Sequence, residues 1–384
     1  MTDEAGFILA LKVVSGITCL LSILGAGLII ATYVAFRDLR TVARQQLVNL
    51  SLADMTVAAS HFVGLAALQV ENYETPHNSD GNGSGNAFNY STAEQDTLCK
   101  VQGGFTMLGT LASFLWTLAL GFYMLMVIVL KRTDVARYLL FFYYPICWGV
   151  PLTLTLWFGL VKPTYLGFGE GADIGWCYIR VVQKSNGNVD HSTTVLAEVL
   201  GYELWFYVTF VSLAAIYITM LFYLKYKGMK IKKHWKYTDL KLVLVPLIFI
   251  LLRMWSGIID ILHYATLGDK SPRNLDDTGG FYALVLLAGV GDSAQGLANA
   301  VLFCAFTRQV RNRLLETARS HLCCFCPDSY LRLRTSERFS DMVVHEATTQ
   351  LDGDSVCEET VRQHTDGYWE TSLILDNIPE KYGT

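Results

Sequence analysis

The chain has 384 residues, of which 52% are hydrophobic and only 17% are charged. Soluble globular domains carry about 25% charged residues, so this composition argues against an ordinary cytosolic fold, and the formal net charge of −4 argues against a nucleic-acid partner. The stretch after Pro327 has 12 acidic and 5 basic residues, which leaves the rest of the chain at +3. We therefore expect a membrane protein with an acidic tail.

The apolar residues lie in seven blocks of about 24 residues. At about 1.5 Å per residue such a block reaches ~36 Å as a helix, which exceeds the ~30 Å hydrocarbon core of a bilayer. The predicted spans cover residues 13–36, 47–70, 103–130, 138–161, 201–224, 242–265 and 281–306. We predict an all-α membrane protein, a seven-transmembrane helix bundle with a short amphipathic eighth helix.

Lysine and arginine counts predict the orientation. The connectors on one side of the predicted membrane contain 17 basic residues and those on the other side contain 7. Since cytoplasmic loops are the more basic, we expect a multi-pass plasma-membrane protein. Its predicted parts are an extracellular N-terminus (1–12), the bundle (13–306), an amphipathic helix (307–326) and a disordered cytoplasmic tail (327–384).

Features of the outside loops agree with this orientation. Asn82 and Asn89 begin Asn-x-Ser sequons in the first outside loop and are candidate glycosylation sites. Cys99, just before the third span, and Cys177, in the second outside loop, both fall on the oxidising side of the membrane. We predict that they form a disulfide.

The cytoplasmic side carries a second group of cysteines. Cys323, Cys324 and Cys326 follow a basic amphipathic stretch after the last span and are candidate palmitoylation sites, with unmodified loop thiols as the alternative. The tail beyond them is poor in hydrophobic residues and bears serines and threonines. Phosphorylation there by a receptor kinase would recruit arrestin, with a solvated tail as the alternative. The lysine-rich third inside loop would meet a G protein or anionic membrane lipid.

Two charges fall at mid-membrane depth. Arg253 and Asp292 each lie eleven residues, about 16 Å, into their spans. Because an unpaired charge in hydrocarbon is costly, we predict a salt bridge between them, which either holds the helices together or acts in gating. Pro246, four residues into the sixth span, is expected to kink its inner end.

Further polar residues occupy the same spans. Asp292, Gln295 and Asn299 follow at helical spacing, and Asp54 in the second span lies at a similar depth to the latter two. These residues and Arg253 predict a buried polar network that holds water or sodium. Nearer the outside, six residues are candidates for an outward-facing ligand cavity: His61, Tyr202, Glu203, Trp205, Asp260 and Tyr264.

Other classes of seven-span protein lack their required residues here. A retinal-binding pump needs a lysine in the seventh span, and residues 281–306 contain none. A zinc hydrolase needs a histidine cluster, but only His61 and His263 fall in or near spans. We find no catalytic set and expect no enzyme activity, cofactor or metal. A receptor is therefore favoured, with a transporter or channel as the alternative.

The motifs resemble those of one receptor superfamily. Seven spans, an outside N-terminus, the cysteine pair and the helix after the last span are similar to the G-protein-coupled receptors. The third span ends in Val-Leu-Lys-Arg without an acidic-Arg-Tyr triplet, and the last lacks Asn-Pro-x-x-Tyr, unlike the rhodopsin-like class. Instead Trp-Gly-Val-Pro at 148–151, Gly-Trp-Cys at 175–177 and Gln-Gly-x-x-Asn at 295–299 resemble the secretin-like and cyclic-AMP-receptor-like groups.

The resemblance implies a function that composition and spacing do not. Further motifs at 49–54, 113–117 and 252–256 are similar to an orphan member of these groups, and the similarity covers residues 13–320. It implies coupling to a heterotrimeric G protein of the phospholipase-C-activating (Gq) type, inositol phosphate and calcium signals, and possible placement in the primary cilium. Without the large ectodomain of secretin-like receptors, the unknown extracellular ligand is expected to be a small molecule or lipid, unless the receptor is constitutively active.

Overall fold

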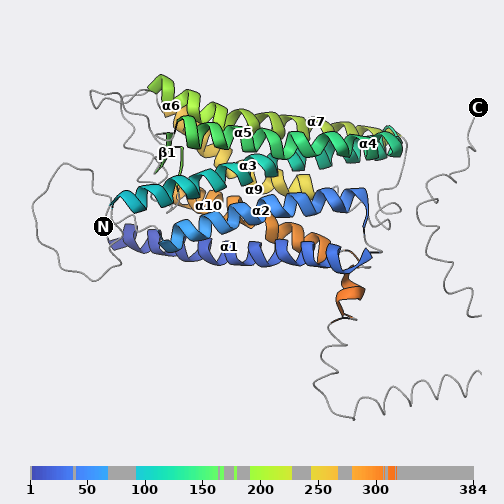
Figure 1. The fold of residues 1–384 in the computed structure, drawn as a ribbon, viewed down its shortest axis with the longest axis horizontal. Helices are drawn as coiled ribbons and strands as arrows, with labels where there is room; N and C mark the ends of the chain where they lie inside the picture. The colour runs from blue at the N-terminus through green and yellow to red at the C-terminus, as the bar shows by residue number, and fades with distance from the viewer. Residues whose placement is uncertain are drawn as a thin grey trace, which may run out of the picture. The chain divides into compact units, whose positions relative to one another are not determined.

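The long helices of the chain lie side by side (Figure 1). The computed structural model describes residues 2–37, 40–67, 92–162, 165–167, 177–179, 191–226, 244–266, 279–305, 307, 310–315 and 317. Met1–Leu314 is one compact unit, and the description below concerns this unit.

The helices form seven rods in the described part of the chain. Five rods consist mainly of α1 (Thr2–Ala35), α2 (Val42–Ala67), α3 (Thr92–Ile128), α9 (Leu244–Thr266) and α10 (Gly279–Ala300), the last extended by η10 (Val301–Ala305). The fourth rod joins α4 (Thr133–Tyr144), η3 (Pro145–Gly149), α5 (Val150–Leu156) and η4 (Trp157–Val161), and the fifth joins α6 (His191–Glu198), η7 (Val199–Glu203) and α7 (Leu204–Tyr226). These rods confirm the predicted seven-helix bundle.

Six of the rods are long and apolar enough to cross a membrane. The remaining rod, α2, has 26 residues, or about 39 Å at 1.5 Å per residue, but more polar side chains. It packs against α1, α3 and α10. Its polar residues therefore face neighbouring helices rather than lipid.

Several helices begin earlier than predicted. Helix α1 begins at Thr2 and α3 at Thr92, each eleven residues before its predicted span. Hydropathy marks only the part of a helix that lies in hydrocarbon. In α3 the added residues, 92–102, are mostly polar in sequence, so hydropathy does not mark them.

The prolines lie where the helical hydrogen bonding changes. Pro145 begins the π-helical turn η3, and Pro151 lies in the first turn of α5 directly after it. Proline lacks an amide hydrogen and crowds the preceding turn, which favours a local widening of the helix. Pro246 is the third described residue of α9. The residues just before Leu244 lie outside the described part of the chain, so the kink expected at Pro246 stays a prediction.

A small hairpin lies at one end of the bundle. Strands β1 (Leu166–Gly167) and β2 (Tyr178–Ile179) pair antiparallel, with Leu166 opposite Ile179. Cys177 precedes β2 and forms a disulfide with Cys99 of α3. We call this the disulfide end; β1, α6 and the start of α1 lie there, and α4 lies toward the other end (Figure 1).

The packing follows the requirements of a bilayer. Large apolar side chains point outward, such as Leu24, Phe141 and Leu160, which are 68%, 75% and 76% exposed. Small residues permit close helix contacts inside. A β-carbon at Gly296 of α10 would lie 2.6 Å from Oγ of Ser22 in α1, so only glycine fits there.

Loss of the disulfide should destabilise the protein. We expect Cys99→Ser and Cys177→Ser each to lower the unfolding free energy by about 2–4 kcal/mol, because the unfolded chain gains freedom. The double variant should be no less stable than the worse single variant, since both residues serve one bond. Surface expression and the melting temperature of purified protein measure this effect.

The matched control is Cys147→Ser, which removes a buried free thiol. Its effect should add to that of Cys99→Ser. A peptide map of mature protein with both Cys99 and Cys177 free would contradict the assignment.

Candidate functional site

Arg253 and Asp292 meet at the centre of the bundle. Arg253 is the tenth of 19 residues in the apolar segment Leu244–Leu262, and Asp292 is the thirteenth of 25 in Gly280–Cys304. Each therefore lies at the midpoint of its segment. Nη1 of Arg253 donates to Oδ1 of Asp292 across 2.9 Å, and the arginine side chain is 2% exposed. This salt bridge joins α9 to α10.

Two other side chains surround the pair. Oγ of Ser256, one turn along α9 from Arg253, donates to the same oxygen of Asp292 across 3.0 Å. The guanidinium carbon of Arg253 lies 5.4 Å from the centroid of the Phe114 ring in α3, within the range of a cation–π contact. Nε of Arg253 is buried without a hydrogen-bond partner among the described residues. The charge thus relies on Asp292 and the ring of Phe114.

Asp54 is the centre of a second polar cluster. It is 4% exposed and lies midway along α2. Oγ of Ser113 in α3 donates to its Oδ1 across 2.7 Å, and Nδ2 of Asn299 in α10 donates to its Oδ2 across 3.0 Å. Gln295 bonds separately to Thr117 of α3, from Nε2 to Oγ1 at 3.5 Å. The five predicted network residues therefore divide among three sets of bonds.

The partners in α3 were missed by the sequence analysis. Ser113, Phe114 and Thr117 contact the three sets, and all come from one helix. A signal existed, because polar residues recur in the third span at the three- and four-residue spacing of one helix face. This stripe consists of Gln102, Thr106, Thr110, Ser113 and Thr117, all buried.

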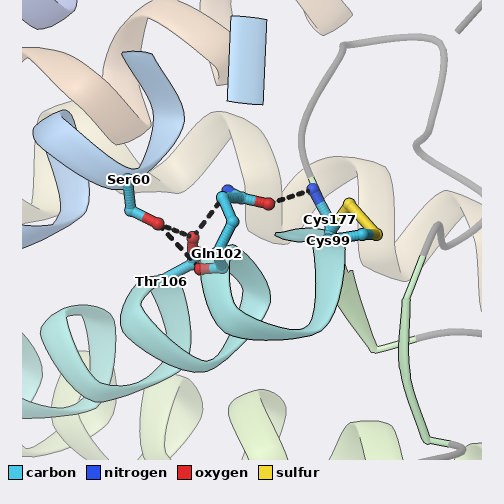
Figure 2. The surroundings of a disulfide bond; sticks show 5 residues. All are labelled: Ser60, Cys99, Gln102, Thr106 and Cys177. Carbon is cyan, nitrogen blue, oxygen red and sulfur yellow. Dashed lines mark hydrogen bonds between the residues drawn. A yellow bond between two sulfur atoms is a disulfide. The ribbon is translucent and has the colours of Figure 1, made fainter. Parts of the chain in front are cut away.

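At the disulfide end the same stripe holds the hairpin. Oε1 of Gln102 accepts from the backbone N–H of Cys177 across 2.7 Å, and its Nε2 donates to Oγ1 of Thr106 across 3.0 Å (Figure 2). Ser60 of α2 donates to the carbonyl oxygen of Gln102 across 2.7 Å and shares a hydrogen bond with Thr106. The side-chain amide of Gln102 therefore gives the buried backbone N–H of Cys177, beside the disulfide, a hydrogen-bond partner.

The candidate ligand-cavity residues occupy different surroundings. Tyr202 packs on Phe114, with ring centroids 5.5 Å apart, and Nε1 of Trp205 donates to the carbonyl oxygen of Leu200 across 2.9 Å. The carboxylates of Glu203 in η7 and Asp260 in α9 repel each other electrostatically.

His61, another member of the candidate cavity, lies apart from this group. His61 is 3% exposed and shares a hydrogen bond with Ser293, at 3.1 Å, so it packs between α2 and α10 rather than facing an open cavity. The side chain of Tyr264 lies outside the described residues. The structure thus groups Tyr202, Glu203, Trp205 and Asp260 near η7.

Burial also tunes one group beside the disulfide. It raises the pKa of the Tyr178 hydroxyl above its ordinary value, so this group stays protonated and donates to the carbonyl oxygen of Gly201 across 3.2 Å. The hairpin is thereby attached to η7.

A separate polar and aromatic cluster lies away from the disulfide end. The hydroxyl oxygen of Tyr144 accepts from Nε2 of Gln45 at 2.9 Å and from Nδ2 of Asn49 at 3.1 Å. Nε1 of Trp148 donates to Oδ1 of Asn49 across 3.2 Å, and the ring of Trp116 packs against Tyr144. This cluster joins α2, α3 and the fourth rod where the π-turn η3 lies.

The other candidate sites fall outside the described residues. These are Asn82, Asn89, Cys323, Cys324, Cys326 and the tail. Within the described ranges, no three histidine, cysteine or acidic side chains gather as a metal site would require. Of the predicted eighth helix, residues 310–315 are helical, and Val310 is fully buried in the core.

Neutralising one member of the charge pair should be worse than neutralising both. Asp292→Asn leaves the buried charge of Arg253 without its partner, and Arg253→Gln leaves the half-buried carboxylate of Asp292 without its own. Removing one partner of a buried pair typically costs about 3–5 kcal/mol. The double variant should be milder than the worse single variant, because no lone charge remains. Unfolding of the purified protein in lipid nanodiscs measures the unfolding free energies of the unaltered protein, the two single variants and the double variant.

The control cycle combines Arg253→Gln with Asp134→Asn, which removes an exposed carboxylate of α4. Those two effects should add. A coupling energy below about 0.5 kcal/mol between Arg253 and Asp292 would reject the pair as a stabilising contact.

Known proteins are similar to this chain in sequence. The model of the family described as 7 transmembrane receptor (Secretin family) matches residues 8–172. G-protein coupled receptor 157 of Mus musculus is 30% identical over 327 residues, covering 81% of this chain and 85% of the mouse protein. The Homo sapiens protein of that name is 32% identical over 318 residues, covering 78% and 82%.

These relatives are receptors rather than enzymes, as predicted for this chain. The similarity extends over most of both proteins, and the matched region contains the disulfide and the helices that carry the charge pair. The chain therefore belongs to the G-protein-coupled receptors, in the group of G-protein coupled receptor 157.

Proposed function

We propose that the chain transmits an extracellular stimulus to a heterotrimeric G protein, through the Gq and phospholipase C pathway that its resemblance implies. The observation that carries the mechanism is the Arg253–Asp292 salt bridge at mid-span, because it joins α9 to α10 and contacts α3 through Phe114. A change in this one contact alters the packing of three helices. Such an arrangement suits a receptor, which needs two alternative packings of its bundle.

The proposed switch is a movement of α9. In one state the pair holds α9 against α10, where Gly291 lies so close to the carbonyl oxygen of Leu252 that a β-carbon would clash. In the other, the Leu244 end of α9 moves away and exposes a cavity to the G protein. A ligand drives this change only if it binds the second state better than the first.

The proposed topology puts the disulfide end outside. Support comes from the bias of 17 basic residues to 7 in the connectors and from the Cys99–Cys177 bond, which requires an oxidising compartment. The end of α9 that begins at Leu244 then faces the cytoplasm, with the plasma membrane, including that of the primary cilium, as the proposed location.

The proposed stimulus enters at the disulfide end near Tyr202, Glu203, Trp205 and Asp260. A small molecule or lipid is the proposed stimulus, and constitutive activity is the other outcome. On the cytoplasmic side, we propose that a receptor kinase and arrestin act on the acidic tail. Anionic lipid or the G protein is the proposed partner of the lysine-rich connector before α9.

A G-protein activation panel without added ligand tests the proposal. Cells that express the receptor at graded surface levels should give inositol phosphate output in proportion to that level, and the output should disappear in cells that lack Gq-type α subunits. Asp134→Asn, at an exposed site, is the control and should match the unaltered receptor at equal surface expression.

Membrane current and solute flux are recorded in the same cells. Current or flux that persists without G-protein α subunits, together with no second-messenger signal, would instead support the transporter or channel alternative.

A further inference from the structure

The β1–β2 hairpin is seated inside the disulfide end of the bundle. Leu166 and Ile179 are 1% and 6% exposed, and they belong to one apolar cluster with Phe114, Phe158 and Phe206. The side chain of Ile179 lies directly against the α-carbon of Gly201, where a β-carbon would clash with it. The hairpin therefore cannot shift without changing its contact with η7.

Tyr178 makes the next contact toward the membrane centre. Its hydroxyl donates to the carbonyl oxygen of Gly201 across 3.2 Å, and its ring meets the ring of Tyr202 edge-on, with centroids 5.9 Å apart. Because Tyr202 follows Gly201 in the π-turn η7, the hairpin holds both the backbone and the ring of this turn. The position of Tyr202 thus depends on the hairpin.

Phe114 connects Tyr202 to the charge pair. The Phe114 ring is fully buried, with its centroid 5.5 Å from that of Tyr202 and 5.4 Å from the guanidinium carbon of Arg253. It also meets Phe249 of α9 edge-on at 5.5 Å. A densely packed ring in this position transmits displacement, since protein interiors leave few voids to absorb it.

We propose that Phe114 is the positioning residue that couples the disulfide hairpin to the Arg253–Asp292 pair. The sequence of contacts runs from Tyr178 through Tyr202 and Phe114 to Arg253. A role of Phe114 in signalling rests on the proposed receptor function. The energetic coupling between the hairpin and the charge pair does not. A stimulus that moves the hairpin at the disulfide end would then change the environment of the charge that joins α9 to α10.

Proximity alone does not establish such coupling, so the test measures energies. Melting temperatures are recorded for full-length receptor in nanodiscs of uncharged phosphatidylcholine. Tyr178→Leu is introduced both into the unaltered receptor and into the Arg253→Gln/Asp292→Asn receptor. Coupling predicts that the loss of melting temperature differs between these two backgrounds by at least about twofold, although separated sites normally add.

The comparison is repeated with Phe114→Leu and with its matched control, Phe158→Leu. Both phenylalanines are fully buried in the same cluster, but Phe158 contacts Trp157 and Tyr165 and has no cation–π contact to Arg253. With Phe114→Leu present, Tyr178→Leu should lower the melting temperature equally with and without the charge pair. With Phe158→Leu present, the two losses should still differ. If Tyr178→Leu gives no folded receptor, Tyr178→Phe, which removes only the hydrogen bond to Gly201, replaces it.

Two results would overturn the proposal. One is an equal effect of the Tyr178 variant in both backgrounds, which shows that the hairpin and the charge pair are independent. The other is a difference that survives Phe114→Leu, which shows that the coupling takes another route. Neither readout uses a G protein, so a failed signalling panel leaves this test unaffected.

Discussion

The guanidinium of Arg253 is the constraint on which the rest of the bundle depends. A charge at the midpoint of a membrane span requires a counter-charge and a dry, polarisable surrounding. Asp292 supplies the first and the Phe114 ring the second, so α9, α10 and α3 must meet at one point. Ser256 uses the same oxygen of Asp292 and fixes its rotamer. The charge pair therefore fixes where α9, α10 and α3 meet, and close packing adds to it elsewhere in the bundle.

The same logic extends along α3. Its buried polar stripe supplies a partner for Gln295, for Asp54 and for the backbone of Cys177. Since lipid cannot satisfy these groups, each bond must be made between helices. A polar helix such as α2 is tolerated in the middle of the bundle for this reason, with apolar side chains left to cover the outside. Helix α3 thus links the disulfide end to the centre of the membrane.

The depth of a residue in the membrane is predictable from its position in the span. The neighbouring helix that its side chain faces is harder to predict. Counting residues brought Arg253 and Asp292 to the same level, and the structure has them in contact. The similar spacing of Gln295 and Asn299 suggested one network, yet they bond to different partners because adjacent turns of α10 face different residues of α3 and α2. The rotation of each rod is set by packing that a single sequence does not reveal.

Local irregularities of the backbone were also not predictable from the sequence. The π-turn η7 and the two-residue strands of the hairpin leave no periodic signal, although they determine where Tyr178 and Tyr202 meet. The polar stripe of α3, by contrast, was legible and would have identified Ser113 as a partner of Asp54.

The most direct measurement is a distance across the end of the bundle opposite the disulfide. Spin labels at Leu247 of α9 and Leu130, just after α3, occupy exposed sites near that end, with the other free thiols replaced. Pulsed electron resonance should give one main distance for the unaltered pair. The Arg253→Gln/Asp292→Asn receptor should add a longer-distance population, because α9 is no longer tied to α10. Identical distance distributions in the two proteins would contradict the claim that this salt bridge holds the bundle in one state.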